Sequence, residues 1–419
     1  MKLLIVSMNY EDPSSMFVNY YHSLAEIAEV DFYGPGFSTE AELEQGILDY
    51  AEKEGPFEAV ILIFSLLYSS LDLSSIRDIY QFHRCKLSDY SVNQVVRYAD
   101  RIVDDIKKLD TVQMVLFDQD IINIRNEWYN CLADLLDGGF YILSPGIEFL
   151  PTFVEREGRS FGDGLMLNNR FRNLLEKYPQ RSISIGTIAS IPGEYYWGPL
   201  ENRKYDWVVP GNIDGCYPNR GKILRMLEAK GYKVFQGFID RTMAYRVDSS
   251  RIERCEYQQG IVRQVDERLG KPSPYLQAAM RRESIAAWRE NYKVSLRKSK
   301  IAYADGGDGH VVVRKYIEIP ANGTLLAGDN VMGLERWGFR NWENMVIVTP
   351  ENVLDITEEL LKNPEKMQDI ANKGRQLVLS VHTTRKRAED TIRAIESIRN
   401  GKYQGSYWED GKFIITERK

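Results

Sequence analysis

The chain alternates short apolar segments with amphipathic ones, and this alternation limits the folds it can adopt more than any other feature. Residues 3–6 are apolar, apolar side chains between 17 and 27 recur at helical spacing, and 30–33 form a second apolar run. A strand, a helix and a strand within about 35 residues predict a βαβ unit of a parallel sheet. Further strands are expected at 59–64, 113–117, 140–143 and 183–191, and a helix at 40–53. The N-terminal half is therefore expected to form an α/β domain with a parallel sheet.

The same alternation restarts near residue 205. A strand, a glycine turn and a helix opening at Tyr217-Pro-Asn-Arg220 are followed by further segments of the same kind. Strands are expected at 205–209, 233–235, 299–303, 324–327 and 345–348, and helices at 351–362 and 384–399. The pattern predicts two α/β domains, at 1–200 and 201–398, and a C-terminal tail at 399–419. In that tail, Glu409-Asp-Gly411 between β-prone residues predicts a hairpin.

One glycine-rich stretch, residues 305–329, carries the strongest functional signal. Asp305-Gly-Gly-Asp-Gly309 leads into a short segment with Arg314 and Glu318, which ends at Asn322-Gly323 before an apolar strand. Glycines let a backbone approach a ligand closely, and the first amides of a helix bind phosphate. The stretch therefore has the parts of an anion-binding pocket.

This stretch also resembles a known family. Glu318-Ile-Pro-Ala-Asn-Gly323 and the strand after it resemble the Glu-Ala-x-Ala-x-Gly segment of family 4-like glycosyltransferases, and more closely the CgeB-type branch. In that branch an Arg commonly stands just before the Glu, as Arg314 does here. The resemblance implies the GT-B fold, with two Rossmann-like domains facing a cleft. It also implies that the C-terminal domain holds a nucleotide-sugar donor.

The resemblance implies roles for individual residues. Glu318 is expected to accept hydrogen bonds from the ribose hydroxyls of the donor, and Arg314, helped by Lys315, is expected to meet the diphosphate. The glycine turn is expected to bring backbone amides to the same group, and the first turn and helix of the domain are expected nearby. These further donor-binding candidates are Gly306, Gly307, Gly309, Gly211, Asn212 and Arg220.

The candidates for catalysis leave alternatives open. Asp118 and Asp120 follow the expected strand 113–117, where they could act as a general base on an acceptor hydroxyl or cap the next turn. His310 stands where retaining members of the family often have a second Glu. It could contact a phosphate or a sugar hydroxyl, or be a plain turn residue. Retention of the anomeric configuration is what we expect from the family resemblance. No DxD motif stands at a convincing strand end, and the family generally stabilises the diphosphate without metal, so we expect no obligatory metal ion.

Composition indicates the class of protein and its cellular compartment. Of 419 residues, 43% are hydrophobic and 27% are charged, which is typical of a soluble globular protein. Four cysteines without CxxC spacing argue against a disulfide framework or a zinc site, so we expect a reduced, cytoplasmic setting. No apolar run is long enough to span a membrane, so we expect any membrane association to be peripheral.

The charge of the chain is uneven. The net charge of −6 gives no global attraction to nucleic acid, but residues 239–300 contain 14 basic and 8 acidic residues. A helix is expected at 277–299 within this helical excursion. It could present a solvated face or touch an acidic acceptor.

We therefore expect a glycosyltransferase that moves a sugar from a nucleotide-diphosphate sugar to a glycan or another acceptor. Two alternatives stay open: a non-catalytic nucleotide- or sugar-binding protein of the same fold, and a glycosyltransferase acting on modified nucleic acid. The base and sugar of the donor, the acceptor and the oligomeric state do not follow from the sequence.

Overall fold

The fold is taken from a computed structural model, which describes residues 1–7, 16–64, 66–67, 101–117, 126–150, 164–186, 198–211, 217–235, 292–307 and 310–419. The chain divides into two compact units. Unit 1 comprises Met1–Ile191, Glu335–Gly338 and Val381–Lys419, and unit 2 comprises Pro192–Leu334 and Phe339–Ser380. The chain therefore leaves unit 1 and later returns to it. The expected domain boundaries at residues 200 and 398 stay a prediction.

Unit 1 is built on a parallel sheet. In the described part of the chain this sheet has six strands in the order β2-β1-β3-β4-β5-β6, and every neighbouring pair is parallel. The central strands are buried on both faces, as is typical of parallel sheets covered by helices. The strands are β1 (Lys2–Val6), β2 (Glu29–Tyr33), β3 (Ala59–Ile63), β4 (Val112–Leu116), β5 (Tyr141–Ser144) and β6 (Ser182–Ser184).

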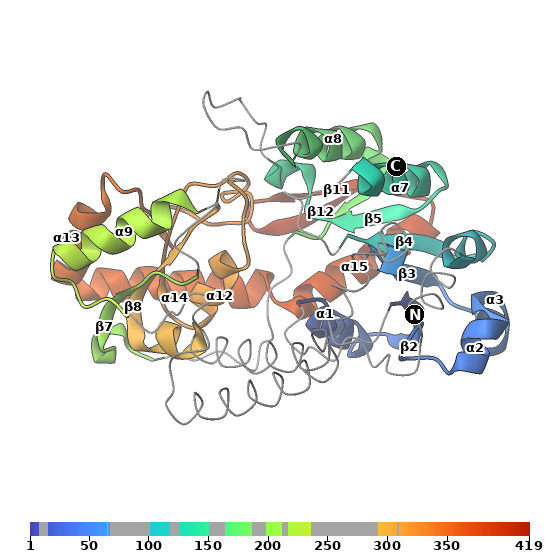
Figure 1. The fold of residues 1–419 in the computed structure, drawn as a ribbon, viewed down its shortest axis with the longest axis horizontal. Helices are drawn as coiled ribbons and strands as arrows, with labels where there is room; N and C mark the ends of the chain where they lie inside the picture. Colours follow the sequence, from blue (N-terminus) through green and yellow to red (C-terminus); the bar gives the residue numbers. More distant parts are fainter. Residues whose placement is uncertain are drawn as a thin grey trace, which may run out of the picture. The chain divides into compact units, whose positions relative to one another are not determined.

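Helices cover both faces of this sheet (Figure 1). α7 (Asn126–Asp137) and α8 (Gly164–Lys177) pack over one face and share a core with alternate residues of β1, β3 and β4. α1 (Met16–Ala25) and α15 (Thr384–Arg399) pair over the other face. A helix expected at 40–53 is two helices, α2 (Glu40–Gln45) and α3 (Ile47–Glu54), because Gly46 between them has a left-handed φ of 106°. Short 3-10 turns lie at Ile147–Phe149 and Pro179–Arg181.

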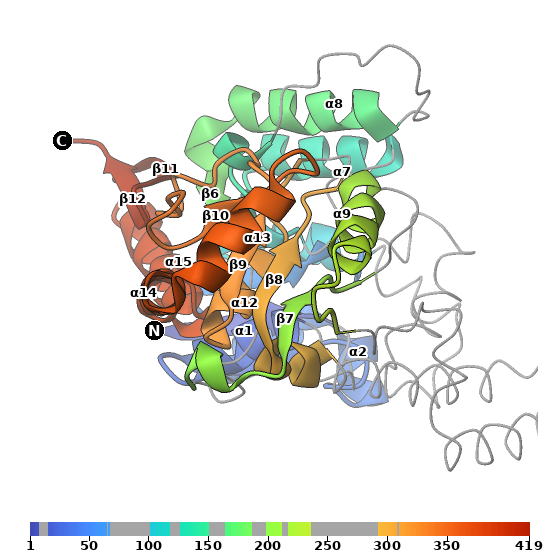
Figure 2. The same cartoon turned by 90° about the vertical axis from the view of Figure 1, so that its left-hand side faces the viewer.

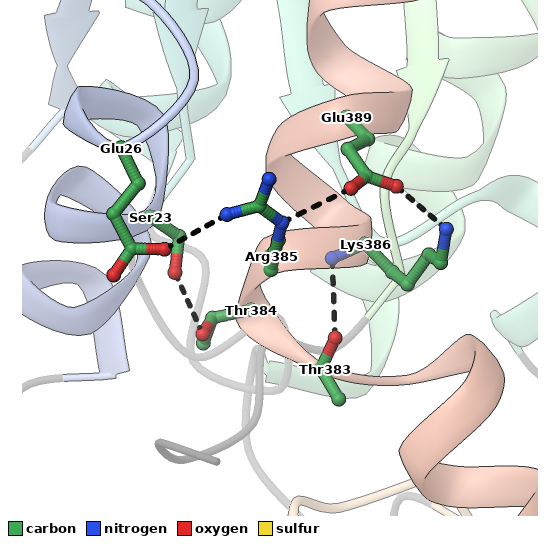
Figure 3. A network of polar contacts seen from close by, with 7 residues as sticks. All are labelled: Ser23, Glu26, Thr383, Thr384, Arg385, Lys386 and Glu389. Atoms are coloured by element: carbon green, nitrogen blue, oxygen red, sulfur yellow. Dashed lines mark hydrogen bonds and ion pairs between the residues drawn. The ribbon is translucent and has the colours of Figure 1, made fainter. Parts of the chain in front are cut away.

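Side-chain contacts fix α15 to α1, although the two helices lie at opposite ends of the sequence. The hydroxyl of Ser23 donates to that of Thr384 at 2.9 Å, and Arg385 forms an ion pair with Glu26 at 3.2 Å (Figure 3). The side chain of Thr383 caps α15 by accepting from the amide of Lys386 at 3.2 Å. These contacts join the last helix to unit 1.

The predicted C-terminal hairpin is confirmed. β11 (Tyr403–Glu409) and β12 (Lys412–Glu417) are antiparallel, and the turn residues Asp410 and Gly411 have φ angles of 50° and 73°. The hairpin packs on β6: the indole of Trp408 donates to the carbonyl of Ser184 at 2.7 Å. The tail is therefore a structural part of unit 1.

Unit 2 contains the second sheet. Its four described strands run parallel in the order β10-β9-β8-β7, and Val234 adds a parallel bridge to Trp207 beyond β7 (Figure 2). The helices α9 and α13 pack together against this sheet around Trp207 and Ile301. The elements are η5 (Leu200–Asn202), β7 (Tyr205–Val208), α9 (Pro218–Ala229), β8 (Ser299–Ala304), α12 (Lys315–Ala321), β9 (Leu325–Gly328), β10 (Val346–Ile347), α13 (Val353–Lys362) and α14 (Pro364–Val381).

Two α/β units with parallel sheets confirm the expected Rossmann-like class. Only the last part of the expected helix 277–299 is described, at residues 292–298, which lead directly into β8. The rest of the basic segment, 239–291, lies outside the described residues. No helix within the described ranges is long and apolar enough to cross a membrane.

Candidate functional site

The candidate site lies where the strand order of unit 2 reverses. The chain runs from β7 outward to Val234 and then returns to the other side of β7 as β8, which continues to β9 and β10. In open parallel sheets, ligands bind beside the carboxyl ends of the strands at such a switch point. Gly211 follows the carboxyl end of β7, and Asp305, Gly306 and Gly307 follow that of β8. Two of the motifs singled out in the sequence therefore meet here.

Two cations lie directly against Gly211. This glycine has a φ of 102°, and a Cβ atom built on it would lie 2.7 Å from Nη1 of Arg220 and 2.7 Å from Nζ of Lys315. Lys315 also donates to the carbonyl oxygen of Pro210 at 2.8 Å. Arg220 is 1% exposed, and its guanidinium stacks 3.8 Å from the ring centroid of Tyr217. The absence of a side chain at Gly211 thus makes room for two cations, the buried Arg220 and the half-buried Lys315.

The burial of these cations has an electrostatic cost. Burial, and then the neighbouring guanidinium of Arg220, lowers the pKa of Lys315 to about 7. The carboxylates of Glu318 and Asp305 oppose this shift. An incoming anion would relieve the repulsion between the two cations, so the cluster is suited to binding a polyanionic group.

Glu318 lies on the same short helix as Lys315 and is 7% exposed. Its Oε1 is 3.4 Å from Nε of Arg314, and its Oε2 accepts a hydrogen bond from the hydroxyl of Tyr292 at 2.9 Å. Arg314 is the N-cap residue of α12, and its side chain is 35% exposed. The structure thus brings Arg220 together with three residues that were predicted to bind the nucleotide-sugar donor, namely Arg314, Lys315 and Glu318.

The glycine turn after β8 is held by two carboxylates. The amide of Gly307 donates to Asp305 at 2.6 Å, and the amide of Gly306 donates to Asp329 at 3.3 Å. Asp329 also accepts from the hydroxyl of Tyr303 at 2.5 Å. These two amides therefore hold carboxylates in this structure. Their expected approach to a diphosphate stays a prediction.

The carboxyl group of Asp329 is affected by its surroundings. Burial, with a further contribution from the charge of Asp305, raises the pKa of Asp329 to about 6, although the bond from Tyr303 opposes the shift. Gly306 is needed here for space, since a Cβ atom would lie 2.3 Å from Cγ1 of Val331.

The remaining predicted residues are placed only in part. His310 is half-buried in a turn with a φ of 45°, and its amide donates to the carbonyl of Gly307 at 3.1 Å. Asp118, Asp120, Asn212 and Gly309 lie outside the described residues. The proposed general bases of the first domain and one donor contact therefore stay predictions.

Sequence reasoning missed three contributors to the site: Tyr292, Asp329 and the buried Arg203. Arg203 is 6% exposed and donates to carbonyl oxygens at the ends of helix 292–298 and of α12. Tyr292 lies within the expected helix 277–299, but the sequence does not indicate its contact with Glu318. The signal for Asp329 was its place at the end of an apolar strand.

Comparison with known proteins gives a partial family match. Residues 270–393 match a family model described as glycosyl transferase-like. This span includes Tyr292 and the motif from Asp305 to Glu318 but not Gly211 or Arg220. A search of curated protein sequences found no match.

Among solved structures, the chain is similar to sucrose-phosphate synthase from Thermosynechococcus elongatus, with a TM-score of 0.50 and 10% identity over 96% of this chain and 100% of that one. It is also similar to a glycosyltransferase from Rickettsia africae, with a TM-score of 0.47 and 12% identity over 95% and 98% of the two chains. HepE of Anabaena, solved in complex with UDP and glucose, gives a TM-score of 0.45 and 8% identity over 95% and 100%. The first likeness, together with the two parallel sheets, confirms the α/β fold of the GT-B type.

Proposed function

We propose that this protein is a glycosyltransferase that moves a sugar from a nucleotide-diphosphate sugar to an acceptor hydroxyl. The observation that carries the proposal is the cluster of Arg220, Lys315 and Arg314 around Glu318 at the switch point of unit 2. A glycosyl transferase-like family match over residues 270–393 supports it. The CgeB-type branch remains our expectation for its closer relationship.

The cations would stabilise the leaving group. When the bond between the anomeric carbon and the diphosphate oxygen breaks, negative charge grows on the diphosphate. Preorganised positive groups in a buried site lower the energy of that charge more than they would in water. Lys315 and Arg220 would contact the diphosphate, and Arg314 would reach it from the start of α12. Glu318 would accept hydrogen bonds from the ribose hydroxyls.

Positive side chains would take the role that a metal ion has in other glycosyltransferases, so we propose transfer that needs no metal. Transfer should then continue in the presence of a chelator, within about twofold of the untreated rate. An activity lost with chelator and restored by Mg²⁺ or Mn²⁺ would contradict this part of the proposal. We also propose retention of the anomeric configuration, which the configuration of the product tests directly.

Binding of the donor is tested by thermal unfolding with a panel of nucleoside diphosphates. A ligand present at one hundred times its dissociation constant adds about 2.7 kcal/mol to the stability of the folded state. We expect one base to give such a shift, and Glu318→Ala to abolish most of it. If no nucleoside diphosphate shifts the unfolding of the wild-type protein, the proposed donor site is wrong.

Two glycine substitutions distinguish a direct effect on the nucleotide site from the effect of backbone strain. Gly211→Ala places a methyl group against both cations and should weaken binding of the nucleoside diphosphate at least about tenfold. Gly231→Ala is the matched control, since Gly231 has a φ of 85° with no atom within 4 Å of the added carbon. Both variants should lose similar stability from backbone strain, about 1 kcal/mol, but only Gly211→Ala should lose affinity. Equal affinities would argue against a diphosphate at this cluster.

Hydrolysis or transfer of the donor sugar then distinguishes an enzyme from a binding protein of the same fold. A protein that binds the nucleotide sugar but leaves it intact with every acceptor class tested would favour the non-catalytic alternative.

A further inference from the structure

Tyr292 lies in the described helical segment 292–298, directly before β8. Its side chain is buried, at 7% exposure, and its hydroxyl donates to Oε2 of Glu318 at 2.9 Å. Burial, and then the charge of Glu318, raises the pKa of the Tyr292 phenol well above its ordinary value. The phenol therefore stays protonated and acts as a hydrogen-bond donor to the carboxylate.

The backbone behind Tyr292 is firmly held. The carbonyl oxygen of Leu296 accepts from the guanidinium of Arg203 at 3.0 Å and from the hydroxyl of Thr324 at 2.9 Å. Arg203 also donates to the carbonyl of Asn322 at the end of α12, the helix that carries Glu318. One buried guanidinium thus connects the helix of Tyr292 to the helix of Glu318. The phenol and the carboxylate are consequently fixed relative to each other.

Glu318 has two competing neighbours among the described residues. Tyr292 bonds to Oε2, while Arg314 approaches Oε1 at 3.4 Å, longer than a good hydrogen bond. An ionised carboxylate offers about four acceptor positions, so both oxygens keep capacity for further donors. Without the phenol, the charge of Arg314 would be free to draw the carboxylate toward itself.

We propose that Tyr292 is a positioning residue that orients Glu318 to receive the ribose hydroxyls of a nucleoside diphosphate. This inference rests on the proposed function, because it assumes that Glu318 faces a ribose. Tyr292 makes the site selective for ribose over a deoxygenated sugar. The helical segment 292–298 before β8 thereby contributes to the donor site.

The test is a thermodynamic cycle between the protein hydroxyl and the ligand hydroxyls. Calorimetry measures the affinity of wild type and Tyr292→Phe for the nucleoside diphosphate that binds best and for its 2′,3′-dideoxy analogue. Wild type should prefer the ribose form by about tenfold or more, because those bonds are made to a charged acceptor. Tyr292→Phe should reduce that preference to about twofold and leave the affinity for the dideoxy analogue unchanged.

A change in the preference, rather than in affinity alone, separates positioning from a general structural effect. Tyr20→Phe is the matched control, since its buried phenol bonds to the hydroxyl of Thr391 at 2.6 Å in unit 1. It should lose stability and keep the full ribose preference. If Tyr292→Phe does not fold, Tyr292→Met takes its place, because the flexible methionine side chain adapts to irregular gaps.

Several outcomes would overturn the inference. A full ribose preference in Tyr292→Phe would show that Glu318 needs no orienting hydroxyl, and a tighter ribose affinity would show that Tyr292 competes with the ligand. A wild-type protein that binds both nucleotides equally would overturn the inference while leaving the proposed transfer intact. If neither nucleotide binds to the wild type, the proposed donor site fails and the inference falls with it.

Discussion

Lys315 shows how burial converts an ordinary lysine into a group that responds to pH near neutrality. Its ammonium lies beside Arg220 and bonds to a single carbonyl among the described residues, and its pKa is lowered to about 7. A bound diphosphate would favour the protonated form. Binding above pH 7 must therefore take up a proton, and the affinity should fall as the pH rises through that value.

We expect the affinity of wild type for a nucleoside diphosphate to decrease up to about tenfold per pH unit above pH 7. Lys315→Met should bind more weakly at pH 6.5 and lack this additional slope. Calorimetry from pH 6 to 9 checks both, and comparison of the two proteins cancels the titration of the ligand itself. Lys230→Met, at an exposed position after α9, should behave as wild type. A slope shared by wild type and Lys315→Met would refute the assignment.

The same shift has the opposite sign for folding. Between pH 7 and about 10.5 the unfolded chain keeps its proton on Lys315 and the folded protein does not. Because the unfolded state then binds more protons, the contribution of this residue to the free energy of unfolding increases with pH across that window. Stability and affinity should therefore move in opposite directions as the pH rises.

At the scale of elements, the short helix α12 depends on a residue far from it in sequence. The helix spans Lys315–Ala321 and includes Pro320, which has no amide hydrogen to donate. A seven-residue helix of this kind is not stable alone. Arg203 satisfies carbonyl oxygens at its end, donating to Asn322 at 3.1 Å and to Gly323 at 3.0 Å. Tertiary contacts thus stabilise the helix that carries the site.

Replacing Arg203 should therefore destabilise unit 2. Arg203→Met leaves several buried carbonyls without a donor and should lower the free energy of unfolding by about 3 kcal/mol or more. Lys204→Met, at the exposed neighbouring position, should change it by no more than about 0.5 kcal/mol. Chemical denaturation followed by circular dichroism measures both. Equal midpoints for the two variants would show that these carbonyls find other donors.

At the scale of the whole molecule, residues of the C-terminal hairpin complete the core of unit 1. Trp408 is fully buried, its ring centroid lies 6.0 Å from that of Trp337, and the guanidinium of Arg387 lies 4.3 Å above its ring. Its backbone amide also donates to Glu148 at 2.9 Å. Unit 1 therefore needs residues from both ends of the chain, and it cannot complete its core before unit 2 has been synthesised.

Two neighbouring residues of the hairpin provide a direct test. Trp408→Ala should lower the free energy of unfolding by about 3–5 kcal/mol, the range typical of a large buried aromatic side chain. Tyr407→Ala, at a position 36% exposed on the other face of the same strand, should have an effect of about 1 kcal/mol or less. Denaturation followed by circular dichroism compares them. A Trp408→Ala protein as stable as Tyr407→Ala would mean that the hairpin is an appendage.

The sequence determined the local structure and the main members of the site. Periodic apolar patterns predicted the strands of both sheets, and the segment from Arg314 to Glu318 places its polar residues on one short helix, so their proximity follows from spacing alone. The two-unit α/β architecture also followed, because alternating strands and helices have few other ways to bury their apolar faces.

Only the tertiary structure decided which residues meet across long stretches of chain. Lys315 contacts the carbonyl of Pro210, 105 positions away, and Trp408 donates to Ser184, 224 positions away. The same holds for the carboxylate of Asp329, which accepts from the amide of Gly306, 23 positions earlier in the chain. Such contacts depend on strand order, on where a left-handed glycine leaves space and on which buried polar group finds a partner. A local pattern does not contain this information, because it describes each segment's own periodicity and not its neighbours.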